Sequence, residues 1–521
     1  MAKKTNKQAH AAAPKSESAT VVLDKATGID GWFHITKRGS NVSREVRGGL
    51  VTFFTMAYII ALNPLILGTG TDIEGKLING QYPTEDGAVA ASMAAVAAVT
   101  ALIAGIMTIL MGVIGRYPVA LATGLGINSM VGAVLVRSMT WGDAMGLVVW
   151  DGIIILLLVF TGFREAVFRA VPKALRIAIS VGIGLFIAFI GLVDGGVVRS
   201  GIGTITTFAV SGSIDGFPLT LFLIGLLLII GLHLRKTKGA ILIAIIATTI
   251  IGIGYQSIWP VLPQGAGNVA GWASNAPAYT APASWLPDLS LFGNVDLFGG
   301  FYSYAVVDGV AVQQGITFTG FLTGALLVFS LLLADFFDTM GTVVAIGTEG
   351  DLLDANGEPE HLREILVVDS IGAIAGGLGS VSSNTAYVES AAGVAEGART
   401  GLASVVTGAS FLAAVFLSPF VSLVPAEAVA PALVFVGFLM MQQVGDIEWK
   451  DAEIAIPAFL AIIMMPFGYS ISVGIGWGFI AYVIVKIIKG KSDKVHPLMW
   501  VSSALFIIYF IQGPILSWLA S

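Results

Sequence analysis

The sequence contains no cysteine, which excludes disulfides, thiolate catalysis and cysteine-ligated metal sites. Charged residues are also scarce, because they make up 12% of the chain against about 25% in an average soluble domain. Histidine is rare, and every histidine falls at or beyond the end of an apolar run: His10, His34, His233, His361 and His496. We therefore expect carboxylates to carry any proton inside the molecule. We expect no cofactor, no metal and no nucleic-acid partner.

Apolar residues dominate what is present. Hydrophobic residues make up 56% of the chain, and the mean hydropathy is +0.87. A helix needs about 20 apolar residues to cross the hydrocarbon core. The apolar runs cover roughly 50–67, 88–113, 118–137, 144–162, 174–193, 217–233, 239–257, 318–347, 364–378, 381–397, 400–420, 428–442, 454–467, 471–489 and 498–519. The sequence therefore predicts an all-α polytopic protein of the cell membrane with about 14 spans.

Basic residues predict the orientation of the chain. Lys37, Arg38, Arg44 and Arg47 precede the first run, which indicates a cytoplasmic N-terminus. The predicted organisation is a disordered cytoplasmic tail, a first repeat, an extracellular linker without lysine or arginine, and a second repeat: residues 1–30, 31–257, 258–317 and 318–519. Whether the last run, 498–519, crosses the membrane stays open.

The two halves share short patterns. Thr52-Phe53-Phe54-Thr55 in the first run corresponds to Asp335-Phe336-Phe337-Asp338 in the eighth, and Asn128 in the third run corresponds to Glu389 in the tenth. An odd number of spans per half places the halves upside down relative to each other. This is the inverted-repeat plan of secondary transporters.

The third and tenth runs both begin with glycine-rich, extended sequence and then read as helical, over 116–128 and 376–389. Broken spans are tolerated only where protein or water covers the backbone. A half-helix directs its free N–H groups and positive dipole end at a cavity. We therefore expect a binding site between these two segments.

Three carboxylates stand out inside the eighth and tenth apolar runs. Asp335 and Asp338 are three residues apart and share a helix face, and Glu389 follows a Ser-Asn-Thr sequence. A carboxylate at membrane depth costs about 2.5–3.5 kcal/mol on insertion scales. A chain that keeps three of them is expected to carry a polar solute.

Three segments carry a family resemblance: Gly48–Ile60, Ala334–Thr342 and Asn384–Gly393. They resemble the AzgA-like branch of the nucleobase–cation symporter-2 family, the adenine/guanine/hypoxanthine permeases, from about residue 30 to 515. The resemblance implies seven-plus-seven inverted repeats, with a core domain (spans 1–4 and 8–11), a gate domain (5–7 and 12–14), and short strands in spans 3 and 10 beside the substrate. It also implies import of purine nucleobases by proton symport with alternating access.

By position, the resemblance places the family's tenth-span acid at Glu389, its eighth-span acids at Asp335 and Asp338, and its third-span asparagine at Asn128. A carboxylate can accept from a purine ring N–H, and an asparagine offers a donor and an acceptor. The full set predicted to bind substrate is Glu389, Asp338, Asn128, Asp335, Phe336, Ser383, Asn384, Thr385 and Tyr387. Proton coupling is assigned to Asp338, Asp335 and Glu389. Thr342 stands where the related uracil/proton symporters have a histidine.

Simpler roles remain open for these residues. Asp335 could cap an unwound turn, Asp338 could be a structural acceptor, Glu389 could support the site without touching substrate, and Asn128 could be a helix N-cap. Four other acids lie near run ends and are expected at the surface: Asp143, Asp151, Asp194 and Glu396. Asp369 lies within the ninth run and is expected to have a structural or helix-pairing role.

Other functions remain open as well. The nearest alternative is a sodium-coupled or facilitative carrier of xanthine, uracil or another small polar solute. A channel would need a continuous polar pore, whereas the polar groups cluster at one depth. An intramembrane aspartyl enzyme would need facing carboxylates but has no use for two symmetric halves. The expected partners are a purine nucleobase, protons and the lipid bilayer; the preferred purine and a homodimer are left open.

Overall fold

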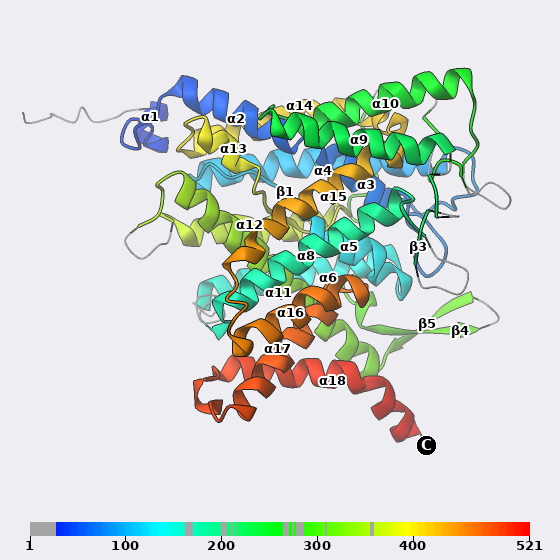
Figure 1. The fold of residues 1–521 in the computed structure, drawn as a ribbon, viewed down its shortest axis with the longest axis vertical. Coiled ribbons are helices and arrows are strands. Elements are labelled where there is room, and N and C mark those ends of the chain that lie inside the picture. The colour runs from blue at the N-terminus through cyan, green and yellow to red at the C-terminus, as the bar shows by residue number, and fades with distance from the viewer. Residues whose placement is uncertain are drawn as a thin grey trace, which may run out of the picture.

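The computed structural model describes residues 28–161, 170–199, 206–209, 212–214, 216–263, 270–273, 276–277, 286–307, 310–354 and 359–520. The predicted N-terminal tail lies outside these residues except for its last three positions, and the predicted linker is described only in parts. In the described residues the fold is dominated by helices, and helices from both halves of the sequence lie side by side (Figure 1).

Helices account for most of the first half of the chain. A short helix, α1, precedes the apolar runs. The elements are α1 (Gly28–Phe33), α2 (Val42–Met56), α3 (Ile59–Gly68), α4 (Ala88–Leu110), β1 (Leu121–Thr123), α5 (Leu125–Ala133), α6 (Trp141–Thr161), α8 (Lys173–Asp194), β2 (Val198–Arg199), β3 (Thr207–Phe208), α9 (Gly216–Leu234) and α10 (Ala240–Ile258).

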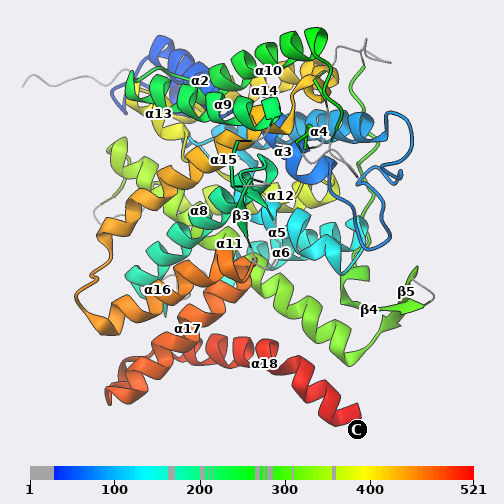
Figure 2. The same cartoon turned by 45° about the vertical axis from the view of Figure 1, so that its right-hand side comes forward.

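The second half begins with a hairpin that projects from the helices in both views (Figures 1 and 2). It continues with α11, which runs unbroken for 32 residues. The elements are β4 (Tyr302–Val307), β5 (Val310–Ile316), α11 (Phe318–Glu349), α12 (Leu362–Leu378), β6 (Asn384–Ala386), α13 (Ser390–Ala395), α14 (Gly401–Ala414), α15 (Ala426–Met441), α16 (Ala452–Phe467), α17 (Ile471–Ile488) and α18 (Pro497–Ala520).

The helices confirm a multi-pass membrane protein. In the described part of the chain, 10 helices are long and apolar enough to cross a bilayer. Shorter apolar helices cover Leu125–Arg137, Ala452–Phe467 and Pro497–Ile511. The first run is interrupted at Ala57 and Tyr58, between α2 and α3, which the sequence did not predict.

Two groups of helices pack mainly among themselves. In the first group α4 packs on α14, α6 on α12, and α2 on both α13 and α14. In the second group α8 packs on α15 and α16, α9 on α10 and α15, and α16 on α17. The groups meet where α5 and α11 contact α8, where α11 contacts α17, and where α10 contacts α2 and α15 contacts α3. The C-terminal helix α18 lies at one edge of the molecule beside α17 (Figure 2).

Glycine pairs set the closest approaches within both groups. A methyl group added at Gly408 on α14 would lie 2.5 Å from the Gly105 carbonyl oxygen on α4. In the second group, a methyl group at Gly437 on α15 would lie 2.4 Å from the Gly184 carbonyl oxygen on α8. Small residues allow such backbone contact between helices in a membrane, where the packing itself drives association.

The third and tenth runs each contain a short strand, and the two strands pair. β1 and β6 are antiparallel, with Leu121 opposite Ala386, Ala122 opposite Thr385, and Thr123 opposite Asn384. All residues of both strands are buried. This pair satisfies backbone groups of two interrupted segments where no helix can do so.

Candidate functional site

The paired strands bring the starts of two short helices together. α5 follows β1 and α13 follows β6 after three residues. The pairing extends beyond the strands, because the Gly124 N–H donates to the Ser383 carbonyl (2.9 Å) and the Tyr387 N–H to the Ala120 carbonyl (3.0 Å). Gly124 suits this position because a methyl group there would lie 2.8 Å from the Thr385 hydroxyl. The two strands thereby place Asn128, Glu389 and the residues of β6 in one region.

Glu389 stands immediately before α13, as its N-cap. The Tyr58 hydroxyl donates to Glu389 Oε1 over 2.5 Å. The Thr55 hydroxyl lies 3.4 Å from the Glu389 carbonyl oxygen. The Glu389 side chain is half-buried. One carboxylate oxygen is thus held by the first span.

The two aspartates of α11 differ in their surroundings. Asp335 is 1% exposed, and its Oδ2 accepts from the Ser383 hydroxyl over 2.5 Å. Asp338 is half-buried, and its Oδ2 accepts from the Thr385 hydroxyl over 3.3 Å. Both therefore contact the segment around β6, but only Asp338 keeps open surface. Asp338 is close enough to both Asp369 and Glu389 to interact with them electrostatically.

Asn128 belongs to a closed chain of amide and hydroxyl groups. It is 0% exposed, and its Nδ2 donates to Asn63 Oδ1 (2.7 Å) and to the Thr123 hydroxyl. Asn63 Nδ2 in turn donates to the Thr100 hydroxyl (2.7 Å). The chain ties the half-helix after β1 to α3 and α4. It holds Asn128 away from open surface.

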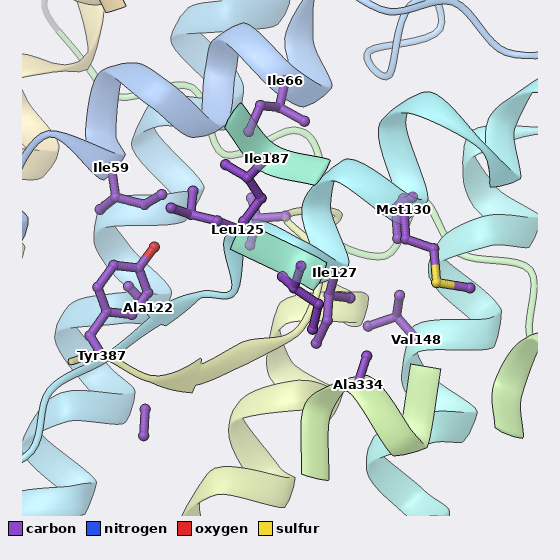
Figure 3. Close-up of a cluster of buried hydrophobic side chains, with 14 of the residues drawn as sticks. Ile59, Ile66, Ala122, Leu125, Ile127, Met130, Val148, Ile187, Ala334 and Tyr387 are labelled. Carbon is purple, nitrogen blue, oxygen red and sulfur yellow. The ribbon is translucent and has the colours of Figure 1, made fainter. Parts of the chain in front are cut away.

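The other predicted site residues lie close by but are enclosed. These enclosed residues are Phe336, Ser383, Asn384, Thr385 and Tyr387. The Tyr387 hydroxyl donates to the Thr123 carbonyl over 2.7 Å, so it joins the two strand segments. Figure 3 shows the apolar surroundings, in which buried side chains of the first half, such as Ala122, Leu125 and Ile127, share one cluster with Ala334 and Tyr387 of the second half. Asp338 and Glu389 are the two half-buried members of the predicted set.

Several structural expectations need correction. Asp335 lies inside the continuous helix α11, so it caps no unwound turn. Asn128 is the fourth residue of α5, whose N-cap is Gly124, so it is not a cap either. Asp143 and Asp151 are 2% and 0% exposed, so they do not lie at the surface. Asp143 lies under β4, where the Tyr304 hydroxyl donates to it, and α6 packs along α12. These contacts join segments far apart in the chain, so the sequence alone could not reveal them.

Sequence reasoning missed three residues of this region: Tyr58, Asn63 and Thr123. Tyr58 and Asn63 follow the Thr52–Thr55 pattern that matches the aspartates of α11, so the repeat marked their span. It did not mark the residues themselves, because their partners Glu389 and Asn128 are distant in sequence. Asp369, which was expected to be structural, accepts from the Thr339 hydroxyl over 2.8 Å.

Comparison with known proteins places this geometry in a family. The model of a family described as "Permease family" matches residues 43–477. The chain belongs to this permease family. This membership confirms the predicted nucleobase–cation symporter-2 resemblance, and it makes the chain a transporter and not an enzyme.

Curated relatives resemble the permease over nearly its whole length. The guanine/hypoxanthine permease PbuG of Bacillus subtilis is 36% identical over 92% of this chain and 99% of its own length. The adenine permease AdeP of Escherichia coli is 33% identical over 92% of this chain and 95% of its own length. The nucleobase transporter PlAzg2 of Paenibacillus larvae is 33% identical over 85% of this chain and 78% of its own.

Solved structures share the fold. The transmembrane domain of the cyanobacterial bicarbonate transporter BicA covers 85% of this permease and 97% of its own chain, with a TM-score of 0.55 at 14% identity. SLC26A9 covers 86% of this permease and 66% of its own chain, with a TM-score of 0.56 at 11% identity. At such low identity these likenesses concern the architecture alone.

Proposed function

We propose that this permease imports purine nucleobases together with protons by alternating access. The relatives that match nearly end to end are named as guanine/hypoxanthine and adenine permeases, which supports a purine substrate. The observation that carries the proposal is the placement of Glu389 and Asp338. They are two half-buried carboxylates from different spans, held beside one pair of strands.

Glu389 is assigned to the substrate. A purine base is flat, neutral near pH 7, and edged with ring N–H donors. Tyr58 engages Glu389 Oε1, so Oε2 is the oxygen left to accept a ring N–H. A hydrogen bond to a charged group contributes roughly 1.5–3 kcal/mol, enough to select bases that present a donor at this place.

Asp338 is assigned to coupling, with Asp335 as its support. Asp338 contacts Thr385 in β6 and interacts with Glu389, so a proton on Asp338 changes the charge beside a bound purine. Asp335 is enclosed and bonded to Ser383, which suits a residue that fixes the strand. In this proposal the buried members of the predicted set form the wall of the site behind the two half-buried carboxylates: Asn128, Ser383, Asn384, Thr385, Phe336 and Tyr387.

The packing supports an inverted repeat. Numbering spans in chain order, the contact of α4 with α14 (spans 2 and 11) has its counterpart in that of α6 with α12 (spans 4 and 9). The contact of α9 with α15 (6 and 12) likewise corresponds to that of α16 with α8 (13 and 5). Matching Asn128 with Glu389 also matches Thr123 with Asn384, and these two residues are direct partners across the strands. A two-fold axis through that pair accounts for all three observations.

The two packed groups correspond to the proposed core and gate domains. The core carries β1, β6 and the carboxylates, and the gate is built from α8–α10 and α15–α17. Rocking of one group against the other around a central site is the general mechanism of repeat-built carriers. We assign 31–257 and 318–519 to the repeats, with the N-terminus in the cytoplasm.

Uptake into proteoliposomes tests the proposal. Radiolabelled guanine is offered with a pH gradient, a sodium gradient or neither, and adenine, hypoxanthine, xanthine and uracil are added as competitors. We expect accumulation that follows the pH gradient and competition by the purines guanine, adenine and hypoxanthine. Accumulation that follows sodium, or competition by uracil alone, would instead establish the sodium-coupled or pyrimidine carrier.

A further inference from the structure

We propose that Tyr58 is a positioning residue that fixes the Glu389 carboxylate for substrate. This inference rests on the proposed role of Glu389, but it concerns a residue of another span to which neither the family match nor the predicted site assigns a role. Tyr58 lies at the junction between α2 and α3, and its side chain is 0% exposed.

The junction gives Tyr58 its place. Backbone hydrogen bonds at the junction join residues three apart in sequence, where an α-helix joins residues four apart. The Ile60 N–H donates to the Ala57 carbonyl (3.2 Å), and the Ala61 N–H donates to the Tyr58 carbonyl (3.0 Å). This junction lies beside Glu389, which both Thr55 and Tyr58 contact. A tyrosine at the junction can extend its hydroxyl toward α13 while its ring stays packed in the core.

The bond restrains the orientation of the Glu389 side chain. Glutamate has several rotatable bonds, and ordering such a side chain costs up to about 2 kcal/mol on folding or binding. The hydroxyl of Tyr58 holds Oε1 at 2.5 Å and leaves the other oxygen as acceptor. An orientation that exists before substrate arrives does not have to be established by the binding energy of the substrate.

Tyr117 is a second buried tyrosine whose hydroxyl has a different kind of acceptor. Tyr117 is also 0% exposed, but its hydroxyl donates to the Val343 backbone carbonyl over 3.3 Å. Removing that hydroxyl leaves every carboxylate contact in place. Tyr58 instead donates to an ionisable side chain proposed to touch substrate. Removing each hydroxyl in turn therefore distinguishes an effect on the position of the Glu389 carboxylate from an effect on packing alone.

The experiment compares Tyr58→Phe with Tyr117→Phe in proteoliposomes, measuring the KM and maximal rate of guanine uptake per reconstituted protein. A purely structural loss reduces the number of active carriers and lowers the maximal rate without changing KM. We expect Tyr58→Phe to raise KM about 10-fold, as for the loss of a hydrogen bond to a charged group. Tyr117→Phe should leave KM within about twofold of the unmodified protein.

The outcomes are distinct. An unchanged KM in Tyr58→Phe overturns the inference, and so does an equal KM rise in Tyr117→Phe. Tyr58→Leu serves as a second variant, since KM does not depend on how much protein folds, and the same rise is expected. If Glu389→Gln transports normally, the proposed substrate site itself fails. If Glu389→Gln is inactive while Tyr58→Phe keeps its KM, only the role of Tyr58 fails.

Discussion

The two interrupted segments, one in each half of the chain, share a backbone plan but differ in chemistry. Each has a three-residue strand followed by a short helix, and the strands pair with each other. In the first segment the polar residue Asn128 is fully enclosed and bonded to Asn63 and Thr123. In the second, Glu389 is half-buried and keeps one oxygen outside its bond to Tyr58.

In the proposed function this difference assigns support to the first segment and substrate recognition to the second. In the enclosed amide chain the Asn128 Nδ2 donors are paired, and these hydrogen bonds tie the first segment to α3. A half-buried carboxylate keeps capacity for a ligand. The first span serves both segments, because Tyr58 contacts Glu389 and Asn63 contacts Asn128. The eighth span serves the second segment, through Asp335 with Ser383 and Asp338 with Thr385.

The largest expected effect falls on the second segment. Glu389→Gln removes the negative charge that we propose accepts a purine N–H, so guanine uptake should fall by about two orders of magnitude. The measurement is initial uptake rate normalised to protein in the membrane. Uptake near the normal rate in a correctly inserted variant would contradict the substrate role.

Asp338→Asn should have the next largest effect, and a selective one. Because the asparagine cannot bind and release a proton, accumulation against a gradient should be lost while exchange of labelled for unlabelled guanine persists at about a third or more of its normal rate. Both assays use the same proteoliposomes. Asp335→Asn is the matched control three residues away, and it should affect both activities equally. Equal loss of both activities in Asp338→Asn would reject a separate coupling role.

Asn128→Ala tests the supporting role of the first segment. It leaves the Asn63 amide oxygen without its donor inside the protein, at a cost of about 1–3 kcal/mol in the free energy of unfolding. The melting temperature in detergent should therefore fall by several degrees, while KM for guanine changes less than in Tyr58→Phe. A large KM rise without loss of stability would show that the first segment also reads the substrate.

Gly124→Ala tests how closely the two segments depend on each other. The added methyl group would lie 2.8 Å from the Thr385 hydroxyl, whose partner is Asp338. Because a side-chain hydroxyl can move aside, the expected KM rise is modest, about two- to fivefold. Steady-state uptake measures it. A normal KM would show that the contact between the segments relaxes without cost to the site.

The smallest effect is expected for an acid outside both segments. Glu360, between α11 and α12, pairs with Arg38 at 3.0 Å, and that hydrogen bond holds the pKa of Glu360 below its usual value. A lowered pKa stabilises the fold above the ordinary carboxyl range, and this stabilisation is lost as the pH falls through the lowered value. Glu360→Gln should leave uptake unchanged and reduce the melting temperature slightly at pH 7. That difference should vanish in acid.

Much of the candidate site could be predicted because its signals are local. Acids inside apolar runs are rare and costly, so Asp335, Asp338 and Glu389 stood out without any structure. Glycine-rich starts indicated where the third and tenth runs break, and the strands lie at those breaks. The hairpins β2–β3 and β4–β5 and the interruption at Tyr58 gave no comparable signal. Their sequences differ little from the loops and helices beside them.

The sequence by itself determined that the chain lies in a membrane, which acids are unusual and which family it resembles, because hydropathy, charge and motifs are properties of neighbouring residues. Only the tertiary structure decided which acid is buried and which keeps part of its surface exposed. Asp335 and Asp338 lie on one helix, three residues apart, yet Ser383 and Thr385 from a distant strand give them different surroundings. Burial depends on contacts between segments far apart in the chain, and those contacts form only when the whole fold is assembled.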